Sequence, residues 1–227
     1  MKNIELLKTV SLFWDLDIVE LGYISEKMVS KKFENGNLIF LEETKGENLF
    51  FVVEGSVKVT RLSKDGREVI LAMLNAGDFF GEMSLLDGES RSANVIALED
   101  TEVLSLYRDD FLDVLNNYPK IAIQLLKEMT SRLRKSDRQI VSLSLSDAEK
   151  RIALCIARFA DEQGIIKNGQ VTIPKIPIQQ DIANMAGTSR ETVSRAMSIL
   201  TEEKYIERNG KELKILKYKN FIKEFDS

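Results

Sequence analysis

A short stretch in the first half of the chain combines residue types that bind phosphate. It reads Phe-Gly-Glu-Met-Ser-Leu-Leu at 80–86, and Arg-Ser-Ala follows at 91–93. Gly81 permits a tight backbone turn. A short helix that begins near Met83 would then direct amide N–H groups, those of Met83 and Ser84 among them, toward an anion. The pattern is typical of a phosphate cassette.

Three side chains in this stretch could complete a nucleotide site. The Arg91 guanidinium offers a fixed fork for two phosphate oxygens, and Ser92 adds a hydroxyl. The Glu82 carboxylate can accept a hydrogen bond from a ribose 2′-hydroxyl. A second interpretation is also open, in which Glu82 and Arg91 pair with each other in a cassette that binds no ligand.

A second group of polar side chains, near the C-terminus, could read DNA bases. An arginine can bond guanine through two donors, and a glutamate can accept from the N4 amine of cytosine. Glu191 and Arg195 are four residues apart and would share one face of a helix. The alternative is an ordinary solvated pair of these two residues. We expect the DNA-binding residues to be Thr188, Ser189, Arg190, Glu191, Ser194, Arg195 and Lys211.

The elements around this group have the pattern of a winged helix-turn-helix. A short helix is predicted over 179–185, a tight turn at 186–188, and a second helix from Arg190 to about Thr201 with Ser189 as its cap. The apolar positions at which the two helices would cross are Ala183, Val193 and Leu200.

A basic hairpin is predicted directly after the second helix. Residues 205–217 form two short strands around an Asn209-Gly210 turn, a common hairpin signal. The lysines of this wing and its exit suit phosphate contacts, which position a protein on DNA without specifying sequence. With the turn before it and the wing after it, the 190–195 stretch favours DNA reading over a solvated pair. The lysines are Lys211, Lys214, Lys217 and Lys219.

The cassette lies in a strand-rich segment. Residues 29–107 show short apolar or alternating runs between glycines spaced about ten apart, which predicts an antiparallel jelly roll. Lys64-Asp65-Gly66-Arg67 is predicted to be a hairpin turn of the Asp-Gly type, with positive φ at both central residues.

A long helix is predicted next, from about Pro119 to Leu145. Its apolar residues alternate by three and four, which favours a parallel dimer because so narrow a stripe has few other ways to be buried. The alternative is an amphipathic helix that packs on its own domain. A hinge follows at 144–147, where Ser146 or Asp147 can cap a helix over 150–160. The seam consists of Leu126, Met129, Leu133, Ser136, Ile140 and Leu143.

Composition excludes several classes of protein. Cys155 is the single cysteine and there is no histidine, so an intrachain disulfide, a Cys-ligated iron–sulfur cluster, a His-ligated haem and a Cys/His zinc site are excluded. We therefore expect no bound metal and no enzymatic activity.

The two parts of the chain differ in charge. Residues 1–137 hold 17 basic and 24 acidic residues, whereas residues 138–227 hold 15 basic and 12 acidic residues, which suits a polyanion-binding module at the C-terminus. No apolar run approaches the roughly 20 residues of a membrane span, and the N-terminus lacks a signal-peptide pattern, so we expect a cytoplasmic protein without membrane contact.

The chain resembles the cAMP receptor protein/FNR family of bacterial transcription regulators over nearly its whole length. Residues 187–195 match the family's reading head, Gly-x-Ser-Arg-Glu-Thr-Val-x-Arg, and the cassette matches Phe-Gly-Glu-x-x-Leu followed by Arg-Ser-Ala. FNR-type members carry a different residue at the position of Arg190, so the resemblance is to the cAMP-receptor-like branch.

The resemblance implies roles for particular residues. Arg190, Glu191 and Arg195 would contact bases in a palindromic DNA site with TGTGA-like half-sites, and RNA polymerase would be a partner. Ser136 stands where the cAMP receptor has a threonine that meets the adenine. Asp137 stands where that receptor has a serine, and this departure leaves a cyclic nucleotide in general, rather than cAMP alone, as the implied ligand.

We therefore predict an α+β fold with an N-terminal antiparallel β-roll (jelly roll), a long dimerisation helix and a C-terminal winged helix-turn-helix. The expected domains are 1–117 for sensing, 118–145 for dimerisation and 146–227 for DNA binding. The expected function is a homodimeric, sequence-specific transcription regulator under allosteric control by a cyclic nucleotide. The alternative is a constitutive or differently regulated factor with a vestigial pocket.

Overall fold

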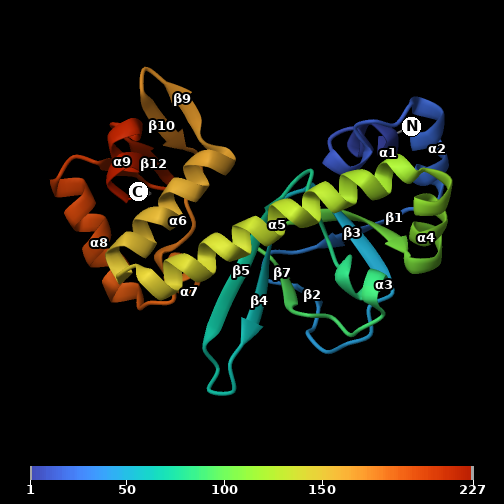
Figure 1. The fold of residues 1–227 in the computed structure, drawn as a ribbon, viewed down its shortest axis with the longest axis horizontal. Coiled ribbons are helices and arrows are strands. Elements are labelled where there is room, and N and C mark those ends of the chain that lie inside the picture. Colours follow the sequence, from blue (N-terminus) through green and yellow to red (C-terminus); the bar gives the residue numbers. More distant parts are fainter. Residues whose placement is uncertain (1, 226–227) are drawn as a thin grey trace. The chain divides into compact units, whose positions relative to one another are not determined.

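The computed structural model describes residues 2–225 and divides into two compact units, Met1–Arg134 and Lys135–Ser227 (Figure 1). The first unit contains two sheets and several helices, and the helices share an apolar cluster with one of the two sheets. Its strands are β1 (Val29–Phe33), β2 (Leu38–Phe40), β3 (Asn48–Glu54), β4 (Ser56–Leu62), β5 (Glu68–Asn75), β6 (Phe79–Phe80), β7 (Asn94–Ala97) and β8 (Thr101–Tyr107). Its helical elements are α1 (Lys2–Leu7), the 3-10 helix η1 (Ser11–Phe13), α2 (Ile18–Glu26), α3 (Met83–Asp87), α4 (Arg108–Asn117) and the start of α5 (Pro119–Leu145).

The first unit is a β-roll, as predicted. Its two sheets have the strand orders β1-β8-β3-β6 and β2-β7-β4-β5, with antiparallel pairing throughout. An apolar cluster that includes Phe50, Val57, Phe80 and Val95 draws side chains from both sheets. The two sheets therefore pack face to face around one core.

Strand β3 is buried on both faces, which explains its uninterrupted run of apolar residues. Phe50 and Val52 belong to the cluster between the sheets. Leu49 and Phe51 point to the opposite face and join a second cluster, to which α4 contributes Phe111. Alternating side chains of one strand thus serve two cores.

The hairpin between β4 and β5 differs in detail from the prediction. Gly66 has a φ of 83°, but Asp65 does not have a positive φ. The Ser63 N–H donates to the Arg67 carbonyl, and the Gly66 N–H donates to the Ser63 carbonyl. The loop therefore has three residues rather than two, and such loops need the left-handed conformation at the last of them only.

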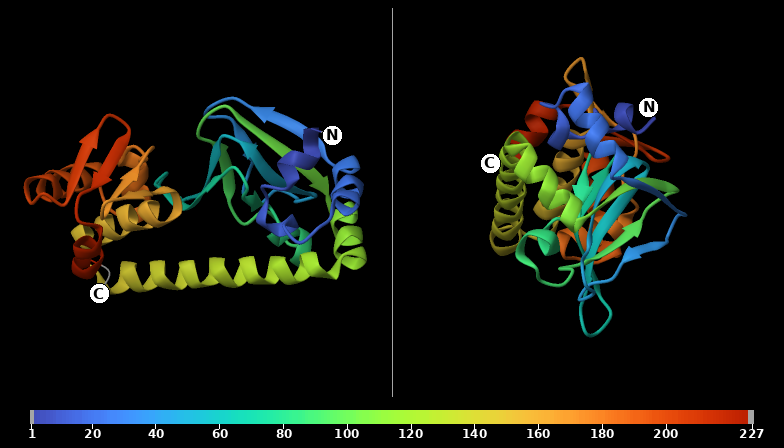
Figure 2. Two further views of the ribbon diagram at one scale, coloured as in Figure 1. Left: turned by 90° about the horizontal axis from the view of Figure 1, so that it is seen from above. Right: turned by 90° about the vertical axis from the view of Figure 1, so that its right-hand side faces the viewer.

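Helix α5 has the bounds that the sequence predicted and is uninterrupted (Figure 2). Near its start, Ile121 and Leu125 are buried in the cluster that α4 also joins. Most of the predicted seam is exposed within the single chain, while Met129 is partly buried against that cluster. No helix within residues 2–225 is long and apolar enough to cross a membrane.

The second unit is a winged helix-turn-helix, again as predicted. Asp147 caps α6 by accepting from the Lys150 N–H. Ala183, Val193 and Leu200, the predicted apolar positions of the two helices, are all buried. The elements are α6 (Ala148–Gln163), β9 (Ile165–Lys167), β10 (Gln170–Ile173), α7 (Gln179–Ala186), α8 (Arg190–Glu202), β11 (Ile206–Asn209), β12 (Glu212–Ile215) and α9 (Tyr218–Phe225), with the sheet order β11-β12-β10-β9.

The wing turn lies one residue later than predicted. Asn209 pairs with Glu212 and is the last residue of β11, so the two central turn residues are Gly210 and Lys211. Gly210 has a φ of 60°, whereas Asn209 does not have a positive φ. Glycine at the first central position is the requirement of the other favoured hairpin turn, type II′.

Candidate functional site

The phosphate cassette forms one compact cluster in the first unit. Gly81 follows β6 with a φ of 84°, and α3 begins at Met83, as predicted. A Cβ on Gly81 would lie 2.6 Å from an Arg91 Nη atom. Glycine is therefore needed both for the turn and for the approach of the arginine.

Arg91 is the buried cation of this cluster. Nη1 donates to the Gly81 carbonyl at 2.7 Å and to the Ser84 hydroxyl at 2.8 Å, while Nη2 donates to the Asn48 carbonyl at 2.7 Å. The guanidinium lies over the Phe40 ring, 4.2 Å from its centroid. Burial lowers the pKa of Arg91 and the charge of nearby Glu82 raises it. The group still stays charged at neutral pH, because arginine is effectively always protonated in proteins.

The charge of Arg91 is incompletely compensated by the protein. Among residues 2–225, no carboxylate lies within 4 Å of its guanidinium. Its Nε is buried and has no hydrogen-bond partner within that part of the chain. A buried cation is costly unless an anion accompanies it. The surroundings of Arg91 therefore fit a phosphate diester.

Glu82 does not form an ion pair with Arg91, so the pairing predicted for a ligand-free cassette is wrong. Its Oε1 instead accepts from Arg132 Nη1 at 3.1 Å. Arg132 also donates to the Phe79 carbonyl at 2.6 Å and lies over the Phe79 ring. Arg132 is not among the residues predicted from the sequence, although its position four residues before Ser136 on the same helix could have indicated it.

A loop between β2 and β3 closes over the cassette. The Arg91 N–H donates to the Thr44 carbonyl at 2.8 Å, and the Glu43 N–H donates to the Arg91 carbonyl at 2.9 Å. A Cβ on Gly46 would lie 2.0 Å from the Ser84 hydroxyl, so only glycine fits there. This contact was not predicted from the sequence, because a glycine at position 46 indicates a turn but does not indicate which residue the turn contacts.

The remaining cassette residues differ in exposure. Ser84 is buried, while Met83 and Ser92 are exposed, and the Ser92 hydroxyl lies 3.6 Å from the Met83 sulfur. Ser136 and Asp137 are exposed on the part of α5 that belongs to the second unit. The cassette belongs to the first unit, so a contact of these two residues with a base stays a prediction.

The predicted DNA-reading residues lie at the start of α8. The Ser189 hydroxyl accepts from the Thr192 N–H at 3.2 Å, which caps the helix as expected. Arg190, Glu191 and Arg195 are all exposed. Within the described chain, Glu191 and Arg195 form no ion pair within 4 Å, and base reading by these residues stays a prediction.

Glu191 is held in its charged form. Its own backbone N–H and the Ser189 hydroxyl lower the pKa of its carboxyl, and the charges of Arg190 and Arg195 lower it further. An ionised carboxylate is acceptor-only. It is thus suited to accept from the exocyclic amine of cytosine. Two other predicted polar residues are Thr188, which precedes the cap residue and is half-buried, and Ser194, which lies within α8 and is exposed.

Arg151 on α6 holds the turn between the two helices. Its Nε donates to the Ala186 carbonyl at 2.7 Å, and its Nη1 donates to the Ser146 carbonyl at 2.8 Å. Gly187 takes the left-handed conformation, with a φ of 60°, and ends α7. These contacts satisfy carbonyls at the end of α7 and thereby help to fix the direction in which α8 starts.

Two families match the chain. The cyclic nucleotide-binding domain family matches residues 30–118, and the Crp-like helix-turn-helix domain family matches residues 150–222. The chain is 36% identical to the cyclic AMP receptor protein of Thermus thermophilus over 87% of this chain and 88% of the relative. It belongs to the cAMP receptor protein/FNR family. As a member, it is a ligand-responsive, DNA-binding transcription regulator.

Further relatives agree with this membership. The cAMP-activated global transcriptional regulator CRP of Salmonella typhimurium is 32% identical over 79% of this chain and 86% of its own length. Among solved structures, a CooA mutant from Carboxydothermus hydrogenoformans has a TM-score of 0.79 at 24% identity, covering 94% of this chain and 97% of that one. The Thermus thermophilus catabolite activator protein has a TM-score of 0.55 at 32% identity, covering 93% and 96%.

Proposed function

We propose that the chain is a homodimeric regulator whose DNA affinity is controlled by a cyclic nucleotide, with cAMP as the first candidate. The observation that carries this proposal is the Arg91 guanidinium, which is buried without a carboxylate and with its Nε unpartnered. A cyclic nucleotide supplies the phosphate anion that such a site lacks. The names of the cAMP-responsive relatives support cAMP over other ligands.

The cassette residues would each bind a different part of the ligand. Arg91 and Ser92 hold the phosphate, and Glu82 accepts from the ribose while Arg132 keeps its carboxylate in place. Ser136 and Asp137 are the proposed contacts of the base. Because Arg132 and these two residues all lie on α5, ligand binding can bias the helix near the hinge and so reorient the DNA-binding domains.

Calorimetric titration of the full chain with cAMP, cyclic GMP and AMP tests this proposal. We expect cAMP or cyclic GMP to bind with a stoichiometry of one per chain and to change affinity for DNA, and AMP to bind much more weakly. AMP controls for the base and ribose, because it differs in carrying an open, doubly charged phosphate. If neither cyclic nucleotide binds and the affinity for DNA does not change when either is added, the proposed ligand class is wrong.

A second candidate function rests on a specific feature of the same arginine. Three protein acceptors already satisfy the Nη atoms of Arg91, two of them backbone carbonyls. A cassette of this kind can persist as a structural element without a ligand. The chain would then be a constitutive or differently regulated factor, and the titration above separates the two candidates.

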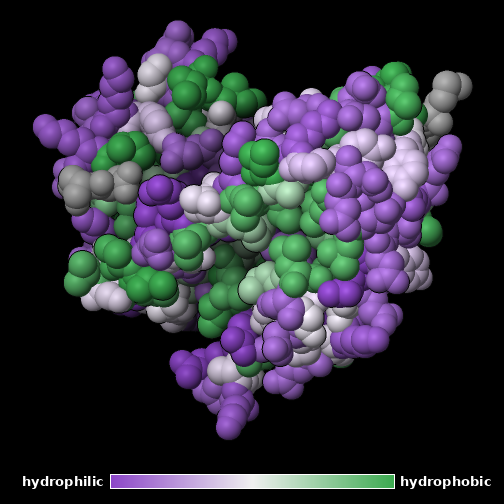
Figure 3. All heavy atoms as spheres, turned by 45° about the vertical axis from the view of Figure 1, so that its right-hand side comes forward, coloured by the Kyte–Doolittle hydropathy of each residue, from purple (hydrophilic) through white to green (hydrophobic). Residues whose placement is uncertain are grey.

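The seam of α5 supports dimer formation. Leu126, Leu133 and Ile140 recur at seven-residue intervals and are 66%, 62% and 61% exposed. Figure 3 shows hydrophobic residues exposed among hydrophilic ones on the face that it presents. A heptad stripe of exposed branched side chains is what a parallel partner helix covers.

Leu133→Glu is expected to weaken dimerisation roughly a hundredfold or more. Each protomer would lose a buried leucine, and two carboxylates would face each other across the seam. Sedimentation equilibrium measures the change, with Lys127→Glu as the control, because Lys127 lies outside the seam on the same helix. Equal dissociation constants for the two variants would show that the seam is not the dimer interface.

The remaining proposals follow from family membership and the surface of the second unit. The partner is double-stranded DNA with palindromic TGTGA-like half-sites, and RNA polymerase is the next partner in the cytoplasm. The proposed division of labour is 1–117 for sensing, 118–145 for dimerisation and 146–227 for DNA binding. We propose no catalytic role. Burial raises the pKa of the Cys155 thiol, which favours its neutral form over the nucleophilic thiolate.

A further inference from the structure

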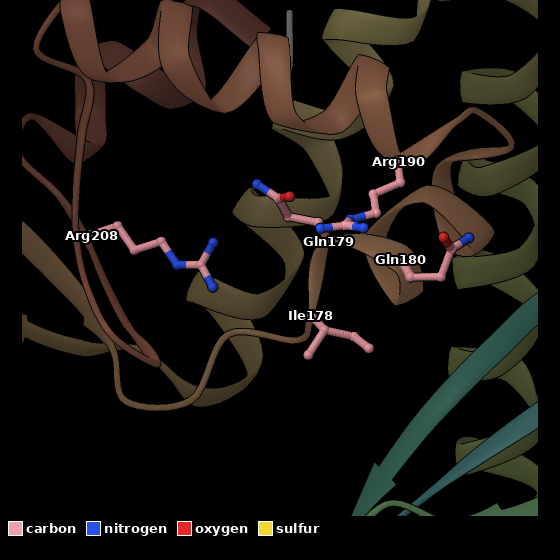
Figure 4. Close-up of a pocket in the computed structure, with 5 residues that line it drawn as sticks. All are labelled: Ile178, Gln179, Gln180, Arg190 and Arg208. Carbon is pink, nitrogen blue, oxygen red and sulfur yellow. The ribbon is translucent and has the colours of Figure 1, made fainter.

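A cavity of about 420 Å³ lies in the second unit beside the start of the recognition helix α8. It is open to solvent and is lined by residues from three elements and their ends. Arg190 enters from α8, Arg208 from β11, and the remaining residues from the start of α7 (Figure 4). The lining residues are Ile178, Gln179, Gln180, Arg190 and Arg208.

The strand pairing explains why Arg208 faces this cavity. Arg208 is two residues after Ile206 on β11, so both side chains leave the same face of the sheet. That is the core face, since Ile206 and the cross-strand partner of Arg208, Leu213, are completely buried. Glu207 lies on the opposite face together with Lys214. Because side chains alternate between the two faces of β11, Arg208 points toward the helices, at the edge of the apolar core.

The guanidinium of Arg208 is oriented but not neutralised. Its Nε donates to the Gly210 carbonyl at 3.1 Å, which leaves both Nη atoms for another acceptor. Among residues 2–225, no carboxylate lies within 4 Å of Arg208 or of Arg190. Two unpaired guanidinium groups thus line one cavity, and like charges so arranged favour an anion between or beside them.

The amides at the start of α7 add polar groups to the same cavity. The Gln180 side-chain NH₂ donates to the Asn184 side chain at 2.9 Å, which holds that amide on its own helix. Gln179 lines the same cavity (Figure 4). Planar guanidinium groups together with amide donors are a typical set of phosphate ligands.

We propose that this cavity receives one phosphate of the DNA backbone and that Arg208 binds it. The inference rests on the proposed DNA-binding function and adds a contact that the lysine pattern of the wing did not indicate. Because Arg190 lines the same cavity and begins the recognition helix, the Arg208–phosphate contact would hold the protein on the DNA backbone beside the bases that Arg190 meets. Arg208 is a positioning residue in this scheme, and it carries no sequence preference of its own.

The salt dependence of DNA binding gives the first test. Each phosphate contact adds about 0.9 to the slope of log affinity against log salt, so Arg208→Ala should reduce the slope by about one per half-site and about two per dimer. Affinity at roughly 0.1 M salt should fall on the order of tenfold per half-site, equally for all sequences. Lys223→Ala is the control, because it removes a positive charge from exposed α9 without touching the cavity.

A second test locates the contact on the DNA. Duplexes are made from the tightest site recovered from a random pool, each with one uncharged methylphosphonate in place of a phosphate. One position per half-site should weaken wild-type binding on the order of tenfold and should have no further effect on Arg208→Ala. Arg208→Lys should keep most of the salt slope and lose part of this coupling, because it retains the charge without the fork.

The outcomes separate the possible failures. If wild-type protein binds no duplex, the proposed DNA function and this inference both fall. If it binds and Arg208→Ala leaves the slope and the methylphosphonate pattern unchanged, the inference alone is overturned. Binding of inorganic phosphate to the free protein that disappears in Arg208→Ala, without any change in DNA binding, would also overturn it by assigning the cavity to a small anion.

Discussion

Replacing Arg190 with alanine is expected to reduce affinity for the preferred DNA half-site by about 1–3 kcal/mol, roughly 5- to 150-fold, and to relax the preference at one base pair. Arg190 is exposed in the first turn of α8 and has no carboxylate within 4 Å among the described residues. Its donors are therefore free for a guanine edge. Because a dimer uses two copies, the effect on a palindromic site should be about twice as large in free energy.

The measurement is a binding titration against a panel of duplexes that differ at single positions. Ser198→Ala on the same helix is the matched control, because the Ser198 hydroxyl donates only to its own helix, at the Ser194 carbonyl. Affinity for random-sequence DNA should be nearly unchanged in both variants. A uniform loss across all duplexes would instead make Arg190 a phosphate contact.

Replacing Arg91 with glutamine is expected to weaken cyclic nucleotide binding roughly a hundredfold or more. A charge-assisted hydrogen bond to phosphate contributes about 1.5–3 kcal/mol, and the arginine fork can form two of them. The variant also leaves the Gly81 and Asn48 carbonyls with poorer donors, so we expect it to unfold at a lower temperature. Titration calorimetry and thermal unfolding measured on the same sample separate these two effects.

Two further variants make the Arg91 result decisive. Lys45→Gln removes a charge from a neighbouring exposed side chain that contacts Glu47, and ligand affinity should change less than about twofold. Ser92→Ala removes an exposed cassette hydroxyl and should weaken ligand binding without a loss of stability. If Arg91→Gln is folded and binds the nucleotide as tightly as the wild type, the cassette is not the ligand site.

The local pattern of residues was enough to predict most elements. The period of three and four predicted α5 with the bounds Pro119–Leu145 that it has. The cap at Ser189, the glycine turn and the apolar positions predicted the two helices that present Arg190. These features depend on interactions between residues at most a few positions apart, and sequence spacing describes such interactions directly.

The two hairpins show where local reasoning stops. Asp65-Gly66 and Asn209-Gly210 are both strong turn signals, yet in each hairpin only the glycine has a positive φ. The register of the flanking strands decides how many residues the loop contains, and the register depends on which side chains the sheet must bury. Both turns were located from the sequence, but the first was given the wrong type and the second was placed one residue too early.

The functional residues show the same difference between features that depend on neighbouring residues and features that depend on residues distant along the chain. The residue types of the cassette and of the reading head could be predicted from the sequence, because each motif is contiguous and its helix or turn is local. The packing of the chain was needed to show that Glu82 pairs with Arg132 rather than Arg91, that Gly46 lies against Ser84, and that Arg208 faces the cavity of Arg190. These partners are distant along the chain, and which of several possible charges meet is set by how the sheets and helices pack.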